Sequence, residues 1–343
     1  MLRPAVLATN PLLPPARELL EEHFTLIENP GPNPWGQDEL VRRCESVFGL
    51  LAFMTDRIDA GFLRRAPGLR VIACAFKGYD NIDLAACTEA GVWVTVVEDL
   101  LTVPTAELAV GLAIAVGRNV IPGNDLVKAG RFSGWRAHLY GKGLAGSCVS
   151  IAGVGRVGGA IARMVAGFAP SALRLYDREA PRLPDLPGID VRRVDDRALF
   201  AEADFLFLAL PLSEATRHFV DRHRLEWMKR EAVLINVGRG SVVDESAIAT
   251  ALADGRLGGY AADVFSMEDW SEPNRPASIP SGLRDSHAGT VLTPHLGSAV
   301  RSVRERIELA AASSVVAVKD GRTPPGALNR PSATAPARAA EGA

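Results

Sequence analysis

The sequence is poor in cysteine, in net charge and in long apolar runs, and each shortage excludes a class of function. Its four cysteines are scattered, so no Cys-x-x-Cys pair indicates a metal site or a disulfide framework. A net charge of −2 does not provide the excess of basic residues that is typical of nucleic-acid-binding proteins. The longest apolar run, residues 108–116, is far shorter than the roughly 20 residues of a bilayer span. We therefore expect no metal, no nucleic-acid or membrane partner and, by default, a cytoplasmic location.

The chain has instead the length and the alternation of a two-domain α/β protein. Its 343 residues, 48% of them hydrophobic, exceed what one ordinary core holds. Short apolar runs typical of strands alternate with helical segments, which predicts parallel sheets. The strands of a first series are predicted at residues 5–8, 24–27, 47–53, 69–75 and 92–96. Those of a second series are predicted at residues 149–152, 172–176, 204–209, 233–237, 259–262 and 290–293.

Two series of this kind predict two doubly wound, Rossmann-like domains. Pro104 is predicted to open one long helix from Thr105 to about Ala129, with proline in its first turn. A last helix is predicted over residues 298–319. The tail, residues 331–343, is rich in alanine and proline and has little to bury, so we expect it to be disordered.

A glycine-rich turn follows the first strand of the second series. Gly153 permits a tight turn, Gly155 lets the backbone approach a pyrophosphate, and Gly158 lets the next helix pack closely on the sheet. Asp177 ends the next strand, where a carboxylate accepts hydrogen bonds from the ribose 2′-hydroxyl of NAD. Arg178 beside it could stack on the adenine or offer charge to the 2′-phosphate of NADP. The turn therefore predicts NAD as the cofactor, with some use of NADP.

Three later stretches place an arginine, an acid and a histidine after predicted strands. Residues 234–240 read LINVGRG and contain Arg239, residues 259–265 read GYAADVF, and residues 293–297 read TPHLG around His295. Together they resemble the NAD-dependent D-2-hydroxyacid dehydrogenases, and the resemblance extends to about residue 330. It departs at Ser266, where the family commonly has glutamate, and at Trp270, where it commonly has proline.

The resemblance implies a catalytic set of Arg239, Glu268 and His295. A guanidinium suits an oxyanion, and an imidazole moves a proton near neutral pH. Glu268 would orient the imidazole, although its choice over Asp269 depends on the alignment. The residues implied at the cofactor are Leu100, Thr105, Gly153, Gly155, Arg156, Val157, Gly158, Asp177, Arg178, Val237, Gly238, Asp263 and Gly297. Among these, Asp263 would face the nicotinamide carboxamide.

The resemblance also implies how the domains are connected. In this family the cofactor domain is inserted into a discontinuous substrate domain. The substrate domain would comprise residues 1–100 and 294–330, and the NAD-binding domain, with a dimerisation segment, residues 101–293. A homodimer is therefore expected.

Several runs resemble one branch of the family, the phosphonate (phosphite) dehydrogenases. These runs are residues 51–54, 77–78, 99–108, 134–135, 140–141, 239–245, 267–270 and 295–301. Lys77 adds a second cation after the strand at residues 69–75, and a compact ammonium suits a phosphorus oxyanion with three oxygens. The residues implied at the substrate are Met54, Lys77, Gly78, Trp135, Tyr140, Arg239 and Ser298. The two aromatic residues fit a core or a dimer interface equally well.

The expected reaction is oxidation of phosphite to phosphate, with hydride transfer to NAD⁺ and water as the nucleophile. His295 or Arg239 would take the proton of the water. One alternative is a D-2-hydroxyacid dehydrogenase such as a glyoxylate or hydroxypyruvate reductase, which uses the same arginine, glutamate and histidine. Another is an NAD-sensing interaction protein, like the corepressors that resemble this family; measurable turnover would exclude it.

Overall fold

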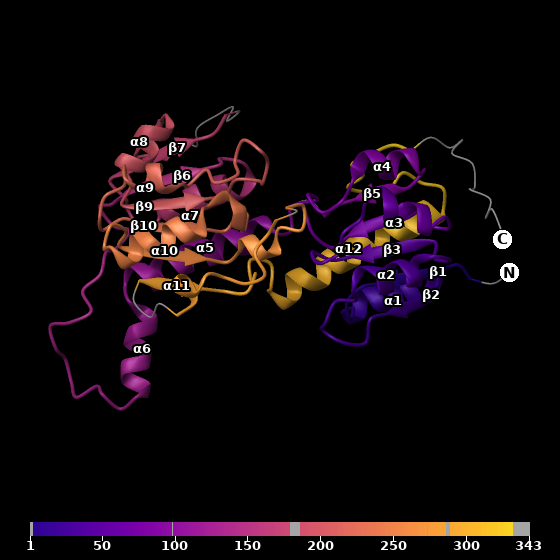
Figure 1. Cartoon of the computed structure of the whole chain (residues 1–343), viewed down its shortest axis with the longest axis horizontal. Coiled ribbons are helices and arrows are strands. Elements are labelled where there is room, and N and C mark those ends of the chain that lie inside the picture. Colours follow the sequence, from indigo (N-terminus) through magenta and orange to yellow (C-terminus); the bar gives the residue numbers. More distant parts are fainter. Residues whose placement is uncertain (1–2, 98, 179–185, 273, 286–288, 332–343) are drawn as a thin grey trace. The chain divides into compact units, whose positions relative to one another are not determined.

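The computed structural model describes residues 3–97, 99–178, 186–272, 274–285 and 289–331. The chain divides into two compact units. The first takes the described residues of Met1–Leu101, Trp270–Pro273 and Val300–Ala343, and the second those of Thr102–Asp269 and Asn274–Ala299. The predicted disordered tail lies outside the described residues from position 332 onward. In sequence, both segments of the second unit are therefore inserted between the two long segments of the first (Figure 1).

The first unit is built on a five-stranded parallel sheet in the order β2-β1-β3-β4-β5. Its strands are β1 (Ala5–Ala8), β2 (Thr25–Glu28), β3 (Gly49–Ala52), β4 (Val71–Cys74) and β5 (Trp93–Thr95). One face packs against α1 (Pro14–His23) and α12 (Arg301–Lys319). The other packs against α2 (Gln37–Cys44), α3 (Ala60–Arg65) and α4 (Leu84–Glu89).

Alternation along the strands produces these two layers. In β3 the side chain of Leu50 joins the core beneath α2, α3 and α4, whereas that of Leu51 joins the core beneath α1 and α12. In β4 Ile72 and Val71 divide in the same way. Because both faces are covered, these strands are continuous apolar runs, as expected for a parallel sheet.

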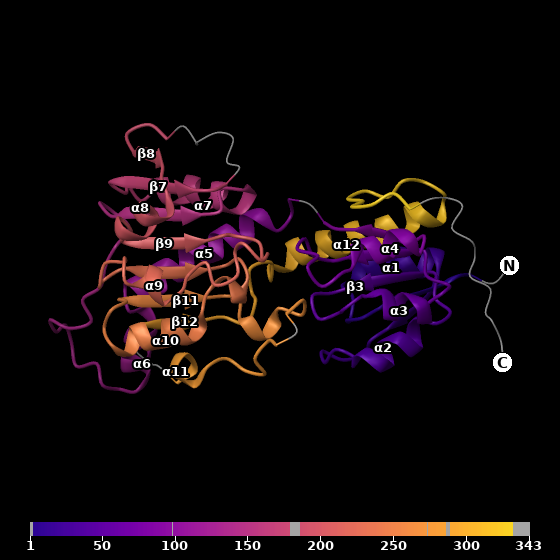
Figure 2. The same cartoon turned by 45° about the horizontal axis from the view of Figure 1, so that its top comes forward.

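The second unit is built on a seven-stranded parallel sheet in the order β12-β11-β10-β9-β6-β7-β8 (Figure 2). Its strands are β6 (Cys148–Ala152), β7 (Ala172–Tyr176), β8 (Asp190–Arg193), β9 (Phe205–Leu208), β10 (Val233–Asn236), β11 (Gly259–Ala262) and β12 (Thr290–Leu292). The helices α5 (Thr102–Gly117) and α7 (Arg156–Ala166) contribute to the core on one face. The elements that contribute to the core on the other face are α8 (Asp196–Ala201), α9 (Arg222–Leu225), α10 (Glu245–Ala253) and α11 (Ser281–Arg284). Two parallel α/β units confirm the predicted fold class.

The prediction of one long helix over residues 105–129 was wrong. The helix α5 ends at Gly117, and a separate helix α6 (Val120–Lys128) follows. A Cβ at Gly117 would lie 2.9 Å from the carbonyl oxygen of Lys142, so the chain is closely packed where α5 ends. Asn119 then adopts a left-handed conformation with φ of 53°, which breaks the helical path. Within the described residues no single helix is long and apolar enough to cross a bilayer, although α5 and α6 meet that test as a pair bent by 64°.

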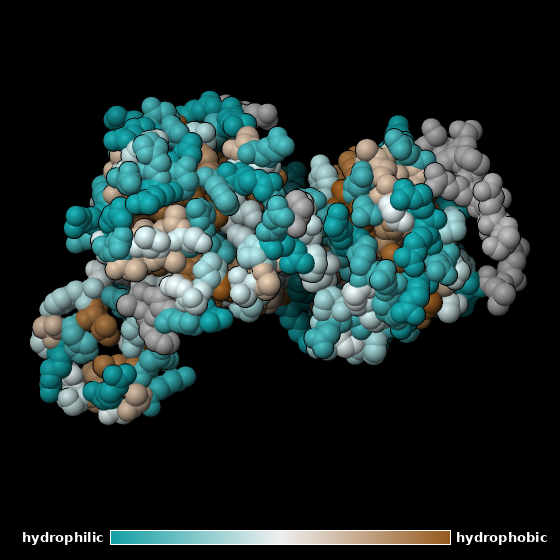
Figure 3. All heavy atoms as spheres, in the orientation of Figure 1, coloured by the Kyte–Doolittle hydropathy of each residue, from teal (hydrophilic) through white to brown (hydrophobic). Residues whose placement is uncertain are grey.

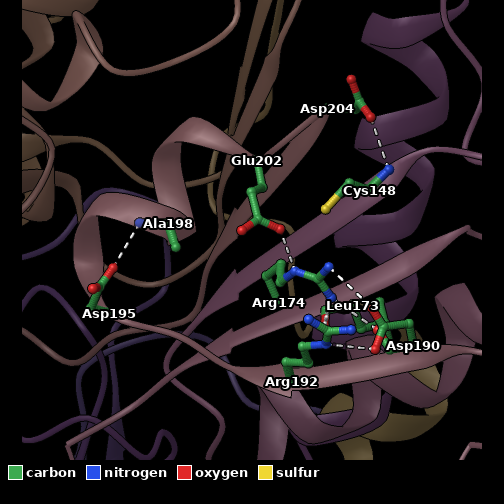
Figure 4. Close-up of polar contacts among 9 residues, drawn as sticks. All are labelled: Cys148, Leu173, Arg174, Asp190, Arg192, Asp195, Ala198, Glu202 and Asp204. Carbon is green, nitrogen blue, oxygen red and sulfur yellow. Dashed lines mark hydrogen bonds and ion pairs between the residues drawn. The ribbon is translucent and has the colours of Figure 1, made fainter.

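The edge strand β8 was not predicted, because its residues lack an apolar pattern and are mostly exposed. A buried arginine of β7 braces it instead (Figure 4). Arg174 is 8% exposed, and its guanidinium contacts the carboxylates of Asp190 at 3.1 Å and Glu202 at 2.5 Å. Two charge-assisted bonds satisfy a cation that burial would otherwise penalise. The last predicted helix also begins later than expected, at Arg301.

Candidate active site

The glycine turn between β6 and α7 has two positions that require glycine and one that does not. Gly153 has φ of 86°, and a Cβ there would lie 2.7 Å from the carbonyl oxygen of Ala209. A Cβ at Gly158 would lie 1.8 Å from the carbonyl oxygen of Gly153. A Cβ at Gly155 would meet no atom within 4 Å. The open space at Gly155, beside the first amides of α7, fits the close approach of a pyrophosphate.

The acid at the end of β7 is bonded to this turn. The Asp177 carboxylate accepts a hydrogen bond from the backbone amide of Val154 at 2.6 Å. The guanidinium of Arg193 donates to the carbonyl oxygens of Asp177 at 2.6 Å and of Arg178 at 3.1 Å. Arg156 and Val157 begin α7. The structure therefore gathers the turn and its acid as a dinucleotide site requires.

Two alanine substitutions separate binding from folding at this turn. Gly155→Ala should lower the affinity for NAD⁺ by about tenfold or more, because its methyl group fills the space left for the pyrophosphate. Its effect on the free energy of unfolding should stay below about 1 kcal/mol. Gly158→Ala should instead destabilise the protein by about 3 kcal/mol, because the new methyl group would overlap the carbonyl oxygen of Gly153 and the backbone there would have to move. Calorimetric titration with NAD⁺ and urea unfolding measure the two effects. Equal NAD⁺ affinity in wild type and Gly155→Ala would contradict the assignment.

Arg239 stands just beyond the carboxyl end of β10 and before the short 3-10 helix η1 (Gly240–Val242). Its own backbone is held by Asn236, whose Nδ2 donates to the Arg239 carbonyl at 2.9 Å and whose Oδ1 accepts from the Gly238 amide at 3.1 Å. Sequence reasoning missed Asn236; the available signal was a polar residue ending a wholly apolar strand. The neighbouring Val237 is buried.

His295 and Glu268 lie within hydrogen-bond distance. The Nδ1 atom of His295 is 2.7 Å from Oε2 of Glu268, which ends the 3-10 helix η2 (Ser266–Glu268). Both side chains are one third exposed. Asp269, by contrast, is 2% exposed, and its carboxylate accepts from the Ser241 amide at 2.6 Å. The geometry thus selects Glu268, and not Asp269, as the partner of the histidine.

Asp263 holds the loop that presents His295. Its buried carboxylate accepts hydrogen bonds from Thr293 Oγ1 at 2.6 Å and from the amides of Leu296 and Gly297, both at 2.7 Å. The His295 amide donates to the Asp263 carbonyl at 3.0 Å, and the histidine itself has φ of 56°. A left-handed conformation of this kind persists only where surrounding bonds fix it. The predicted nicotinamide contact of Asp263 stays a prediction.

The remaining predicted residues of the second unit divide into two groups. Thr105 lies beside Gly297, where a Cβ would be 3.1 Å from the threonine Oγ1, and Ser298 follows half-buried. Trp135 and Tyr140 are 80% and 78% exposed. Among the described residues, neither aromatic side chain contacts Glu268 or His295 through a hydrogen bond or ring contact. One copy of the second unit therefore does not gather these aromatic residues with the histidine.

The first unit places its predicted substrate residues at one edge of its sheet. Met54 follows β3, and Lys77 and Gly78 follow β4, the parallel neighbour of β3. Met54 packs partly on the core, whereas Lys77 is exposed and has no ion-pair partner among the described residues. Leu100 also belongs to this unit and is half-buried. Ligands of open α/β sheets bind at such carboxyl edges.

The buried carboxylic acid Asp56, which sequence reasoning missed, lies in the loop after β3 and is bonded to the loop after β4. Asp56 is 3% exposed, and its Oδ2 accepts from Thr9 Oγ1 at 2.5 Å and from the Phe53 amide at 2.7 Å. Its carbonyl oxygen accepts from Nδ2 of Asn81 at 2.6 Å. Burial, the largest influence, raises the pKa of Asp56 to about 6.

The raised pKa of Asp56 predicts a pH-dependent stability. The folded chain favours the protonated carboxyl, so this contribution is complete below the ordinary pKa of 3.8 and is lost as the pH rises through about 6. The free energy of unfolding should therefore fall by about 3 kcal/mol from this group between about pH 4 and pH 7. Urea unfolding over this range should show the fall in the wild type and a flatter profile in Asp56→Asn. Identical profiles would contradict the prediction.

Comparison with known proteins agrees with this architecture. A family model described as "D-isomer specific 2-hydroxyacid dehydrogenase, NAD binding domain" matches residues 110–297. Glyoxylate reductase from Aeropyrum pernix is 33% identical over 338 residues, which cover 96% of this chain and 97% of that protein. Glyoxylate reductase from Thermococcus kodakarensis is 32% identical over 334 residues, with the same two coverages.

Solved structures extend the likeness to the whole fold. The TT0316 protein from Thermus thermophilus superposes with a TM-score of 0.85 at 35% identity, covering 95% of this chain and 100% of that one. An NADPH-dependent glyoxylate/hydroxypyruvate reductase from Sinorhizobium meliloti, solved with NADP and malonate, gives 0.79 at 26% identity, with coverages of 95% and 97%. The chain belongs to the D-isomer specific 2-hydroxyacid dehydrogenase family and is an oxidoreductase with that family's NAD-binding domain.

Proposed function

We propose that this dehydrogenase oxidises phosphite to phosphate. The observation that carries the proposal is Lys77, an exposed cation without an ion-pair partner among the described residues, at the carboxyl edge of the sheet in the first unit. A carboxylate substrate needs one cation, whereas a phosphite dianion benefits from two. The runs that resemble phosphonate dehydrogenases, such as Met-Glu-Asp-Trp at residues 267–270, support the same substrate.

Each residue then has a role that its chemistry allows. Arg239 and Lys77 bind the oxygens of phosphite, and the Gly78 amide adds a further donor. Bound NAD⁺ supplies the acceptor for the hydride that leaves phosphorus. A water oxygen bonds to phosphorus, and His295 takes a proton from that water while Glu268 fixes the imidazole through Nδ1. The P–H bond breaks and a P–O bond forms, so phosphite, water and NAD⁺ give phosphate, NADH and one proton.

A second candidate is a glyoxylate or hydroxypyruvate reductase. The relatives named above are glyoxylate reductases, so the comparisons favour this candidate over phosphite. Arg239 would then bind the carboxylate of a 2-oxo acid, and His295 would donate a proton to its carbonyl oxygen as hydride arrives from the cofactor. The argument for phosphite rests instead on residues of this chain.

One assay separates the candidates. Purified protein is supplied with NAD⁺ and phosphite, and in parallel with NADH or NADPH and glyoxylate or hydroxypyruvate, while NADH absorbance is followed. Phosphite-dependent NADH formation that exceeds every 2-oxo acid rate supports the proposal. Turnover of a 2-oxo acid without phosphite oxidation supports the second candidate. Gly155→Ala protein, run beside the wild type, controls for contaminating enzymes, because its NAD⁺ saturation should shift with the substitution.

We also propose that the chain forms a homodimer through the segment from α6 to residue 141, which we name the arm. The arm projects from the rest of the second unit (Figure 1), and Figure 3 shows hydrophobic atoms gathered on it. No residue of α6 is buried. The large apolar side chains exposed on the arm are Val120, Ile121, Val127, Phe132, Trp135, Leu139 and Tyr140. A patch of this kind on a helix without core contacts fits a second copy of the chain.

Light scattering tests the arm directly. The wild type should have twice the chain mass of 36.5 kDa. A double substitution, Phe132→Glu with Trp135→Glu, should shift it toward the monomer, because charged groups replace the two aromatic contacts. The control pair Phe168→Glu with Val300→Glu, exposed outside the arm, should remain dimeric. A monomeric wild type at micromolar concentration would rule out this interface.

A further inference from the structure

The loops that carry Arg239 and Glu268 lie directly against each other in the second unit. A Cβ at Gly240 would lie 1.8 Å from the backbone carbon of Phe265 and 2.0 Å from the nitrogen of Ser266. The contact between η1 and η2 is therefore backbone against backbone. Any movement between these loops changes the position of the arginine relative to the glutamate and its histidine.

Two buried carboxylates bond this contact in both directions. Asp269, which directly follows Glu268, accepts from the amide of Ser241 at 2.6 Å. Glu245, the first residue of α10 after η1, accepts from the amide of Ser266 at 2.7 Å. The two acids are 2% and 5% exposed. Each loop thus supplies one carboxylate and one amide, and we name these two bonds the loop clamp.

The two buried carboxylates of the loop clamp carry a free-energy cost that a purely structural contact between the loops would not require. Burying carboxylates carries a desolvation penalty that hydrogen bonds only partly offset. Burial is the largest influence on Glu245 and raises its pKa, and the nearby charges of Asp269 and Glu268 raise it further. Among the described residues, no group of acids, histidines or cysteines could hold a metal ion here. The two hydrogen bonds of the clamp hold the amides of Ser241 and Ser266, which lie two residues from Arg239 and from Glu268 respectively.

We propose that Asp269 and Glu245 are positioning residues that fix Arg239 relative to the Glu268–His295 pair. Ser241 lies two residues after Arg239, and Ser266 lies two residues before Glu268, so the clamp restrains both segments close to their reacting side chains. The inference rests on the proposed roles of Arg239, Glu268 and His295 in hydride transfer. Neither acid touches the substrate; both act through the backbone that carries other groups.

The first test removes and then restores the acceptor. Asp269→Ala should lower kcat/KM by about 100-fold, since small misplacements of reacting groups cost about that much. Asp269→Asn keeps an oxygen for the Ser241 amide and should recover most of the loss. Glu245→Ala and Glu245→Gln should differ in the same way. Affinity for NAD⁺, measured by calorimetry, should stay within about twofold, because the glycine turn is unchanged.

The second test shows whether Asp269 acts through Arg239. In an Arg239→Lys background, Asp269→Ala should lower kcat/KM by less than about fivefold, because the guanidinium that Asp269 would position is already absent. Asp244→Ala is the matched control: it removes the N-cap of α10, next to Glu245, without touching the clamp. It should lower the free energy of unfolding but leave kcat/KM unchanged.

The outcomes are distinct. Near wild-type kcat/KM in Asp269→Ala and Glu245→Ala would overturn the inference, as would an equal loss in Asp244→Ala or full additivity with Arg239→Lys. If Asp269→Ala does not fold, the two Glu245 variants carry the comparison. The measurements use whichever substrate the wild type turns over, so they stand if only the choice of phosphite is wrong. A wild type without any dehydrogenase turnover overturns both proposals.

Discussion

Replacing His295 by Asn is expected to lower kcat by about 1,000-fold, the middle of the range for loss of a general acid or base. Asparagine cannot take the proton that we assign to the imidazole. It is nevertheless a mild substitution here, because the residue has φ of 56°, and asparagine tolerates this left-handed conformation better than most residues. The loss should therefore appear in kcat, with little change in NAD⁺ affinity or in the free energy of unfolding. Steady-state kinetics and urea unfolding of the same preparation measure both.

His218 supplies the matched control for this substitution. It is the other described histidine with a left-handed backbone, φ of 47°, and its side chain is exposed. His218→Asn should retain wild-type kcat. Glu268→Gln should lie between the two, because it keeps a partner for the 2.7 Å contact but removes the charge. If His295→Asn keeps more than about one tenth of kcat, the histidine is not the proton acceptor, and Arg239 becomes the candidate.

The strands were predictable because a sheet covered on both faces leaves a simple signature. The runs at residues 172–176 and 259–262 are apolar apart from Arg174, each is followed by an aspartate, and both agree with β7 and β11 as observed. The edge strand β8 has no such signature, because Arg174 of its neighbour braces it through Asp190. Likewise, the end of α5 depends on packing at Gly117 against residues far along the chain. Local sequence carries no record of such tertiary contacts.

The candidate site divides in the same way. The glycine turn, Arg239 and His295 were predictable from residue type and order, because each chemistry allows few alternatives. Sequence could not decide between Glu268 and Asp269, adjacent acids of similar chemistry. The decision comes from direction: one carboxylate reaches His295, and the other is buried against the Ser241 amide. The directions of these two side chains depend on η2 and on its packing against η1, and both are defined only in the folded chain.

Replacing Lys77 by Ala is expected to lower kcat/KM for phosphite by about 100-fold, the loss of one charge-assisted bond to a dianion. The same substitution should lower glyoxylate reduction by less than about threefold, because Arg239 alone satisfies a single carboxylate. Lys77 is exposed and makes no ion pair within the described chain, so the free energy of unfolding should change little. Kinetics with both substrates on one enzyme preparation give the ratio of kcat/KM for phosphite to kcat/KM for glyoxylate, which Lys77→Ala should lower.

Two further variants make the Lys77 result specific. Lys77→Arg keeps the charge and should retain more phosphite oxidation than Lys77→Ala, although a planar fork replaces a compact ammonium. Arg57→Ala removes another exposed cation, one that lies 3.8 Å from Asp59 after β3, and should affect neither substrate. If Lys77→Ala spares phosphite oxidation, the two-cation argument fails. If it impairs both substrates equally, Lys77 serves any anion and does not select phosphite, and the glyoxylate reductases among the relatives become the better guide to the substrate.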